Sequence, residues 1–260
     1  MNISFDIVGK GESIIFIHGI GSRKISWNGI IKELKEKYLC ISYDLRGHGE
    51  SKVVQNTFYL NDLVEDLEKL RSYLKIQKMH LVGHSLGGMI APSYAIRYRE
   101  RVASITLLST AAFRKVEDEQ KILNIISKIK GEGIDKVLPD LISRWFTDEF
   151  INNNQNIINK RLKQVKSTPL NIFLNVFQIY ASTKMDTWLK KIKVPSLVMT
   201  GENDLGCSPQ INKKIAKALN NSKLIILNNL KHAIVLEDPQ LVATNLKMFL
   251  KSVKYISNFD

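Results

Sequence analysis

Residues 81–91, LVGHSLGGMIA, place a serine at a tight corner between an apolar run and a helical pattern. Gly83, Ser85 and Gly87 match the pattern G-x-S-x-G, which needs a strand before it and a helix after it. On such a corner the nucleophile has a strained backbone, and neighbouring side chains would collide, so glycines flank it. The stretch therefore predicts a nucleophilic Ser85 at the carboxyl end of a sheet strand.

Working outward from this corner, apolar and β-branched runs recur along the chain with helical patterns between them. Alternation of strands with helices indicates an α/β fold, with a mostly parallel sheet covered by helices on both faces. The strand candidates are residues 3–8, 13–19, 38–44, 79–85, 103–109, 195–201 and 222–229. The clearest helical stripe consists of Leu60, Leu63, Val64, Leu67, Leu70 and Leu74. Ser-Pro at 208–209 and Asp-Pro at 238–239 are typical helix starts.

Residues 112–188 break this alternation, because they have helical periodicity and no convincing strand. We therefore expect a helical segment inserted between two strands of the sheet. The predicted domains are a core formed by residues 1–111 and 189–260, and a helical cap formed by residues 112–188.

The chain of 260 residues carries a formal net charge of +13, but its lysines are scattered. No nucleic-acid motif occurs, so we expect a solvated basic surface that could steer anionic substrates. Two distant cysteines, Cys40 and Cys207, make no metal pattern. The chain shows neither a signal peptide nor an apolar run long enough to span a membrane, so we expect a cytoplasmic protein.

A serine nucleophile needs a general base and a group that orients the base. His232 follows the last strand candidate, and Asp204 follows the run at 195–201, so both are expected at the same sheet edge as Ser85. The chain order Ser85, Asp204, His232 agrees with the order on this architecture. Glu202 and Asp186 are weaker candidates for the acid.

The other four histidines have different expected roles. His18 is predicted to brace the loop after its strand, and His48 to shape a turn. His84 is predicted to support the site next to Ser85, whereas His80 is predicted to be solvated.

Two backbone amides are candidates for binding a negatively charged oxygen. The Leu86 amide starts a helix, where amide donors are free and the dipole favours negative charge. The Ile20 amide lies in a loop that Gly19 and Gly21 allow to bend. Together they are predicted to form an oxyanion hole.

Five motifs in this order resemble those of the α/β-hydrolase superfamily, and they span nearly the whole chain. They are HGIG at 18–21, DLRGHGES at 44–51, GHSLGG at 83–88, GENDLG at 201–206 and KHAIVLEDP at 231–239. The resemblance implies an eight-stranded, mostly parallel sheet with a helical cap after the sixth strand. It also implies that Asp44 and Arg46 lie in a structural loop.

Within this superfamily, residues 143–150 and 167–201 look similar to 3-oxoadipate enol-lactonases and to general carboxylesterases. The predicted function is therefore hydrolysis of small to medium carboxylic esters or lactones through an acyl-enzyme. A serine at the corner argues against haloalkane dehalogenases, which place a carboxylate there. A carbon–carbon hydrolase acting on β-diketones, a cofactor-free perhydrolase and a ligand-sensing receptor remain alternatives.

Aromatic residues in and near the cap are candidates for lining a substrate pocket. They are Trp27, Trp145, Phe146, Phe173, Phe177 and Tyr180. No metal or organic cofactor is expected, since no metal-ligand spacing occurs. The expected partner is a small ester or lactone, with no nucleic acid and no membrane span, and the protein is expected to be a monomer or a homodimer.

Overall fold

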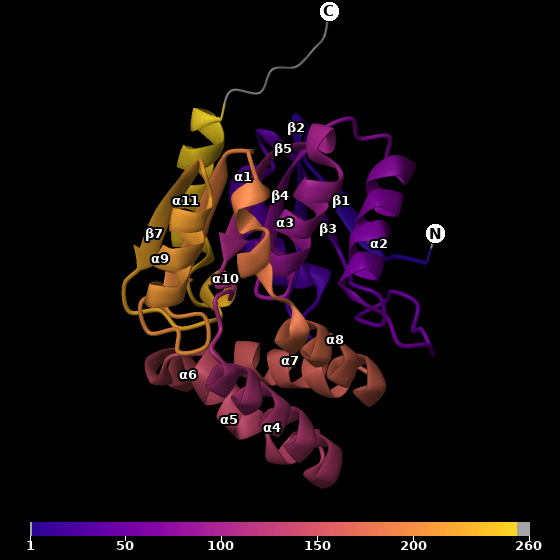
Figure 1. The fold of residues 1–260 in the computed structure, drawn as a ribbon, viewed down its shortest axis with the longest axis vertical. Helices are drawn as coiled ribbons and strands as arrows, with labels where there is room; N and C mark the ends of the chain where they lie inside the picture. The colour runs from indigo at the N-terminus through magenta and orange to yellow at the C-terminus, as the bar shows by residue number, and fades with distance from the viewer. Residues whose placement is uncertain (1, 254–260) are drawn as a thin grey trace, which may run out of the picture.

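Each of the seven apolar runs forms a strand in the computed structural model, which describes residues 2–253. The strands are β1 (Phe5–Val8), β2 (Glu12–Ile17), β3 (Tyr38–Tyr43), β4 (Met79–His84), β5 (Val102–Leu108), β6 (Ser196–Gly201) and β7 (Ser222–Leu227). They form one sheet in the order β1-β3-β2-β4-β5-β6-β7 (Figure 1). Only β1 runs antiparallel to its neighbour, so the predicted mostly parallel sheet is confirmed.

Helices cover both faces of this sheet. Ile14 and Phe16 of β2 pack in one apolar cluster with α1, α10 and α11, and Ile15 and Ile17 pack in another with α2, α3 and α9. Successive side chains of a strand point to opposite faces, so a strand that is apolar throughout needs cover on both. The bounds are α1 (Asn28–Leu34), α2 (Leu60–Tyr73), α3 (Gly87–Arg97), α9 (Pro209–Ala218), α10 (Ile234–Glu237) and α11 (Pro239–Ser252).

The two predicted Pro-containing helix starts are confirmed. Helix α9 begins at Pro209, and the Ser208 hydroxyl accepts a hydrogen bond from the Ile211 amide. Helix α11 begins at Pro239, and the Asp238 carboxylate accepts one from the Leu241 amide at 2.8 Å. Each side chain satisfies an amide that the first helical turn leaves without a partner.

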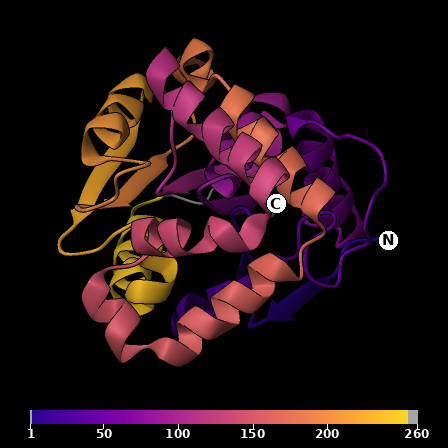
Figure 2. The same cartoon turned by 90° about the horizontal axis from the view of Figure 1, so that it is seen from below.

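The helical segment between β5 and β6 gathers at one end of the sheet and, seen from below, spreads across that end (Figures 1 and 2). Its helices are α4 (Val116–Glu132), α5 (Leu138–Trp145), α6 (Asp148–Asn153), α7 (Gln155–Lys166) and α8 (Leu170–Ser182). Arg161 of α7 donates hydrogen bonds to the carbonyls of Ile20 and Gly21, just after β2. The segment therefore lies over the carboxyl end of the strands. Within residues 2–253, none of the helices combines the length and apolar character that crossing a membrane requires.

The strand count and the position of the insertion differ from those implied by the resemblance. The described residues form seven strands rather than eight, and the helical segment follows the fifth strand rather than the sixth. The structure follows the apolar runs of the sequence, since each run forms one strand. The helical pattern begins directly after the fifth run, so the insertion follows β5.

The strand order changes direction at β2, which has β3 on one side and β4 on the other. In open α/β sheets, the crevice outside the carboxyl ends at such a switch point is where ligands bind. The loop containing Ile20 follows β2, and Ser85 follows β4. The topology alone therefore brings these two segments together.

Candidate active site

Ser85 lies on a sharp corner between β4 and α3, and its φ of 54° is in the left-handed region. Such a backbone costs on the order of 1–3 kcal/mol for a residue with a side chain, so the surroundings must hold it. The Ser85 amide donates to the Leu108 carbonyl at 2.9 Å, and the Thr110 hydroxyl donates to the Ser85 carbonyl at 2.8 Å. A Cβ atom at Gly83 would lie 2.1 Å from the Gly87 carbonyl oxygen, which explains the flanking glycines.

The loop after β2 approaches this corner closely. A Cβ atom added at Gly19 would lie 3.0 Å from the Cβ of Ser85. The hydrogen bonds among residues 2–253 include none donated by the amides of Ile20 and Leu86. His18 Nδ1–H donates at 2.7 Å to the Gly19 carbonyl, which belongs to the same peptide group as the Ile20 amide. The Gly19–Ile20 peptide therefore lies close to Ser85, and the Leu86 amide follows Ser85 directly in the chain. Their role as an oxyanion hole stays a prediction.

Asp204, which is buried, and His232, which is half-buried, form a pair beyond the carboxyl ends of β6 and β7. His232 Nδ1 lies 2.8 Å from Asp204 Oδ2, and the amides of Gly206 and Cys207 donate to Asp204 Oδ1 at 3.0 and 2.8 Å. A carboxylate accepts this bond, so the proton is on Nδ1 and Nε2 is left as an acceptor. His84 Nε2–H donates to the His232 carbonyl at 2.9 Å, which supports the loop that carries His232.

His232 differs electrostatically from the other four histidines. Burial lowers the pKa of His18 well below its usual value, that of His80 to about 4, and those of His48 and His84 to about 3. Burial acts on His232 in the same direction, but the Asp204 carboxylate outweighs it and holds the His232 pKa well above its usual value. Perturbed pKa values of this kind concentrate at functional sites.

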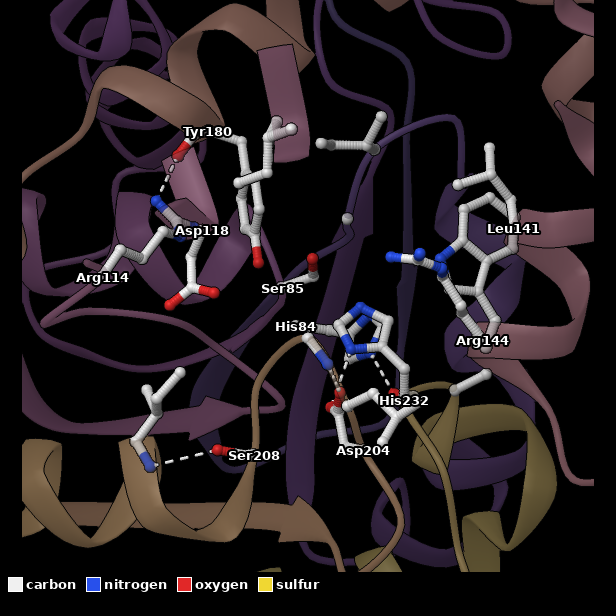
Figure 3. Close-up of a pocket in the computed structure, with 18 of the residues that line it drawn as sticks. His84, Ser85, Arg114, Asp118, Leu141, Arg144, Tyr180, Asp204, Ser208 and His232 are labelled. Atoms are coloured by element: carbon white, nitrogen blue, oxygen red, sulfur yellow. Dashed lines mark hydrogen bonds and ion pairs between the residues drawn. The ribbon is translucent and has the colours of Figure 1, made fainter. Parts of the chain in front are cut away.

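Ser85 and His232 both line one cavity of about 720 Å³. Figure 3 shows the Ser85 hydroxyl and the His232 ring facing the same space, with Asp204 behind the ring. Among the described residues, no hydrogen bond joins Ser85 Oγ to His232. In enzymes without substrate such catalytic hydrogen bonds are often long and tighten when substrate binds.

Half of the aromatic residues predicted to line the pocket do so. Trp145, Phe177 and Tyr180 line the cavity with Ser85, whereas Trp27, Phe146 and Phe173 do not. The predicted lining role is wrong for these last three, because each side chain is fully buried in an apolar cluster elsewhere. Trp27 packs 5.2 Å from Phe16 beside the sheet, Phe146 stacks on Phe150, and Phe173 packs against Phe177.

The remaining histidine predictions have mixed outcomes. His18 and His48 support loops as predicted, since their Nε2 atoms accept from the amides of Leu45 and Gly21 at 2.9 and 3.1 Å. The prediction that His80 is solvated is wrong, because it is fully buried and lies 2.7 Å from the Ser104 hydroxyl. Its strand is central in a sheet with both faces covered, which the local sequence does not reveal.

The alternative acids lie away from His232. Glu202 is exposed and accepts a hydrogen bond from the Asn229 amide, and Asp186 is exposed in a short 3₁₀ helix, Met185–Thr187. Asp44 and Arg46 hold loops together: Asp44 accepts from the Lys24 amide at 2.8 Å, and Arg46 Nε lies 2.6 Å from Asp66.

The cavity is also lined by charged residues that were not predicted from the sequence as lining residues. Arg114, Asp118, Arg144 and Arg161 come from the helical segment, and all line the cavity. Arg161 is buried, and burial lowers its pKa to about 9. Nothing in the local sequence distinguishes the three arginines from the many exposed cations of the chain. Only the overall positive charge indicated that basic residues could attract an anionic substrate.

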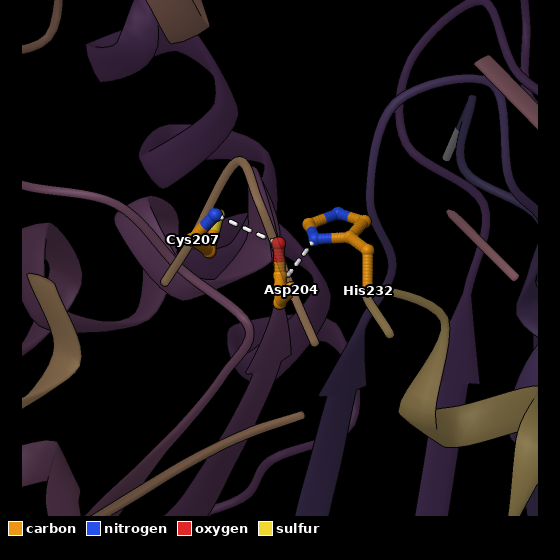
Figure 4. A group of neighbouring side chains, drawn as sticks. All are labelled: Asp204, Cys207 and His232. Carbon is orange, nitrogen blue, oxygen red and sulfur yellow. Dashed lines mark hydrogen bonds and ion pairs between the residues drawn. The ribbon is translucent and has the colours of Figure 1, made fainter. Parts of the chain in front are cut away.

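Within residues 2–253, one group of side chains could hold a metal ion. Asp204, Cys207 and His232 each offer a ligand atom, and these atoms lie within 4.8 Å of one another (Figure 4). The spacing of the two cysteines did not predict this group, because His232 is distant in sequence. Asp204 and His232 are already paired with each other, and this pairing leaves Nε2 directed away from the group.

Comparisons with known proteins agree with this fold. A family model described as the alpha/beta hydrolase fold matches residues 12–156. The chain is 30% identical to 3-oxoadipate enol-lactonase 1 of Acinetobacter baylyi over 195 residues, 75% of this chain and 72% of that protein. An esterase of Thermogutta terrifontis has a TM-score of 0.89 and 24% identity, covering 97% of this chain and 94% of that chain. An enol-lactonase of Burkholderia xenovorans has a TM-score of 0.90 and 21% identity, covering 96% of each chain. The chain therefore belongs to the α/β-hydrolase superfamily.

Proposed function

We propose that this protein is a serine hydrolase that cleaves carboxylic esters or lactones, with Ser85, His232 and Asp204 as its catalytic triad. One observation carries the proposal: a serine held in a left-handed corner shares a cavity with a histidine whose Nδ1 is bonded to a buried carboxylate. This arrangement supplies a nucleophile, a base and a group that orients the base.

In the first half of the reaction, Ser85 Oγ attacks the substrate carbonyl while His232 Nε2 accepts the hydroxyl proton. Asp204 keeps the imidazole in the required tautomer and stabilises the imidazolium that forms. The amides of Ile20 and Leu86 bind the oxyanion of the tetrahedral intermediate. As it collapses, His232 returns the proton to the leaving alkoxide, and an acyl group remains on Ser85.

In the second half, a water molecule attacks the acyl-enzyme. His232 Nε2 accepts a proton from this water, and the same amides bind the second oxyanion. Collapse of this intermediate breaks the bond to Ser85 Oγ, which takes the proton back from His232. The products are a carboxylic acid and an alcohol, or a hydroxy acid when the substrate is a lactone.

The choice of esters and lactones is supported by the enol-lactonase and esterase relatives. Residues 112–188 are proposed to be a cap over a core formed by residues 1–111 and 189–260. In this view the cap supplies the apolar wall of the substrate pocket through Trp145, Phe177 and Tyr180.

A substrate panel tests the proposed function against its alternatives. It consists of p-nitrophenyl esters from acetate to octanoate, simple lactones and a dienoic β-diketone. Turnover of esters or lactones supports the proposal. Activity on the diketone alone indicates a carbon–carbon hydrolase, peracid formation with hydrogen peroxide as the main activity indicates a perhydrolase, and stoichiometric release without turnover indicates a receptor.

The pH profile of kcat/KM is expected to rise with pH through the His232 pKa. Only neutral imidazole can accept the Ser85 proton, so protonation at low pH abolishes activity. Because Asp204 holds the His232 pKa above its usual value, the midpoint of the acid limb should lie above about pH 6.5. The measurement is ester hydrolysis at subsaturating substrate across the pH range. A midpoint well below that of free imidazole contradicts this assignment of the base.

Arg161 connects the proposed cap to the proposed oxyanion loop. Its guanidinium donates to the Ile20 carbonyl at 2.8 Å and to the Gly21 carbonyl, and it lies 4.6 Å from the Trp145 ring. Buried carbonyls that lose their donors are costly, so this cation holds the loop in one conformation. The Ile20 amide depends on that conformation to reach the oxyanion.

Replacement of Arg161 by methionine is therefore expected to lower kcat by about 10- to 100-fold, since small misplacement of catalytic groups has effects of this size. KM should change little, because the oxyanion contact strengthens only in the transition state. The control is Arg97→Met, which removes an exposed cation of α3 that pairs with Glu65 at 2.9 Å. Equal kcat values for both variants contradict a positioning role for Arg161.

A further inference from the structure

Lysines from two segments of the chain gather on one side of the molecule, around α9. The acids within residues 189–220 are Glu202 and Asp204, and Asp204 is buried against His232. The lysines in the same range are all exposed, and they are Lys190, Lys191, Lys193, Lys213, Lys214 and Lys217. This part of the chain therefore carries a large share of the net charge of +13 on its surface.

The lysines of α9 lie on one face of the helix. Lys213, Lys214 and Lys217 are spaced so that they project from the same side, and all three are exposed. Ile215 and Asn212 are buried on the opposite side, where α9 packs against the sheet. Helix α9 therefore presents a wholly polar and basic face to solvent.

The other three lysines continue this basic surface at the end of α9. The short 3₁₀ helix Leu189–Lys191 packs against α9, and Asn220 Nδ2 donates to the Lys190 and Ile192 carbonyls at 2.9 and 3.3 Å. Helix α9 lies beside β7, the last strand of the sheet (Figure 1). Among the described residues, none of the six lysines forms an ion pair. They make up one basic surface without neutralising partners, the α9 patch.

An exposed apolar side chain adjoins the α9 patch. Leu205 lies in the loop before α9, and 76% of its surface is exposed. Both Leu205 and Lys214 line the cavity that contains Ser85. A basic helix face with a neighbouring apolar side chain is typical of proteins that lie on membranes, where the lysines meet anionic headgroups and the apolar group enters the interface.

The composition of the α9 patch favours a lipid surface over a nucleic acid. Residues 189–220 include neither an arginine nor an aromatic residue. Nucleic-acid surfaces use arginine for bidentate contacts with phosphates and bases, and they use aromatic rings to stack on bases. Lysine supplies a point charge without planar geometry, which is sufficient for a diffuse layer of headgroups.

We propose that the α9 patch docks on an anionic phospholipid surface and that Leu205 enters the headgroup region. This inference goes beyond the proposed hydrolytic function and does not depend on it. The attraction comes from the lysines together, because each one near such a surface contributes a small favourable energy. Docking places the cavity beside the lipid, since Leu205 and Lys214 belong to both.

Cosedimentation of the full-length protein with lipid vesicles tests the proposal. One vesicle type is phosphatidylcholine alone, and the other is an equimolar mixture of phosphatidylcholine and phosphatidylglycerol. The protein should bind the mixture at low ionic strength and should bind phosphatidylcholine at least about 10-fold more weakly. Binding to the mixture should weaken as sodium chloride is added, because salt screens the headgroup charge.

Two triple variants separate the position of the charge from its amount. Replacement of Lys213, Lys214 and Lys217 by glutamine should weaken binding to the mixture by about 10- to 100-fold. The matched control replaces Lys32, Lys35 and Lys37 by glutamine, in and just after α1 on the other face of the sheet. It removes the same charge and should bind nearly as well as wild type. Thermal unfolding checks that both variants remain folded.

A single variant tests the apolar contact. Leu205→Gln keeps the net charge and should weaken binding to the mixed vesicles by about 3- to 10-fold. Its binding to duplex RNA, measured by fluorescence anisotropy, should equal that of wild type. This comparison separates lipid docking from a general attraction to polyanions.

Three results overturn the proposal. They are absence of binding to the mixed vesicles at low ionic strength, equal loss of binding in the two triple variants, and binding to duplex RNA without binding to vesicles. The last result assigns the α9 patch to a nucleic acid. None of these results bears on ester hydrolysis, which is measured with a water-soluble substrate in the absence of vesicles.

Discussion

Replacement of Ser85 by alanine is expected to lower kcat for ester hydrolysis by about 10⁴- to 10⁶-fold, the loss seen when a serine hydrolase loses its nucleophile. The variant has no hydroxyl to form the acyl-enzyme. The His232–Asp204 pair should persist, because its hydrogen bonds do not involve Ser85. Substrate binding should also persist, since the cavity keeps its lining residues. The measurement is steady-state hydrolysis of a p-nitrophenyl ester with purified protein.

The matched control for this variant is Ser93→Ala, in the helix that starts at the same corner. Ser93 is part of α3 and does not line the cavity, so its removal should leave activity unchanged. The left-handed backbone at residue 85 also becomes no less strained with alanine, so both variants should unfold at similar temperatures. Comparable activity of Ser85→Ala and wild type contradicts the assignment of the nucleophile.

Replacement of Asp204 by asparagine is expected to lower kcat by about 10⁴-fold, as in other triads in which the acid becomes an amide. The amides of Gly206 and Cys207 both donate to Asp204 Oδ1, so the oxygen of the asparagine side chain must occupy that position. Its NH₂ group then faces His232 Nδ1. This arrangement protonates Nε2 and removes the acceptor for the Ser85 proton.

The control for this prediction is Glu202→Gln, two residues away. Glu202 is exposed and bonds to the Asn229 amide, so its charge should not affect His232. The loss in Asp204→Asn should be mainly in kcat, with KM little changed. Full activity in Asp204→Asn together with inactivity in Glu202→Gln or Asp186→Asn places the acid elsewhere.

The sequence predicted those parts of the fold that depend on local chemistry. The corner at Ser85 needs glycines in any domain that contains it, so its motif can be recognised from the local sequence alone. The seven apolar runs predicted seven strands, whereas the resemblance implied eight. The structure follows the residues, because each of the seven runs forms one strand of the sheet.

What the sequence could not predict depends on contacts between distant residues. An aromatic residue such as Phe146 has the same local pattern whether it lines a cavity or packs in a core, and only the tertiary packing decides. The same holds for Arg114, whose position depends on its hydrogen bond to the carbonyl of Tyr180, 66 residues later. His80 was predicted to be solvated because it lies at the start of a strand. It is buried because helices cover both faces of the sheet, and the local sequence does not show that cover.

Labelling with a fluorophosphonate, followed by intact mass and peptide mapping, tests directly whether Ser85 is an activated nucleophile. One equivalent of label on Ser85 is expected, together with parallel loss of ester hydrolysis and much slower labelling in Asp204→Asn. If ester hydrolysis continues while Ser85 remains unlabelled, or if the label that stops hydrolysis maps to another residue, the proposed triad is contradicted.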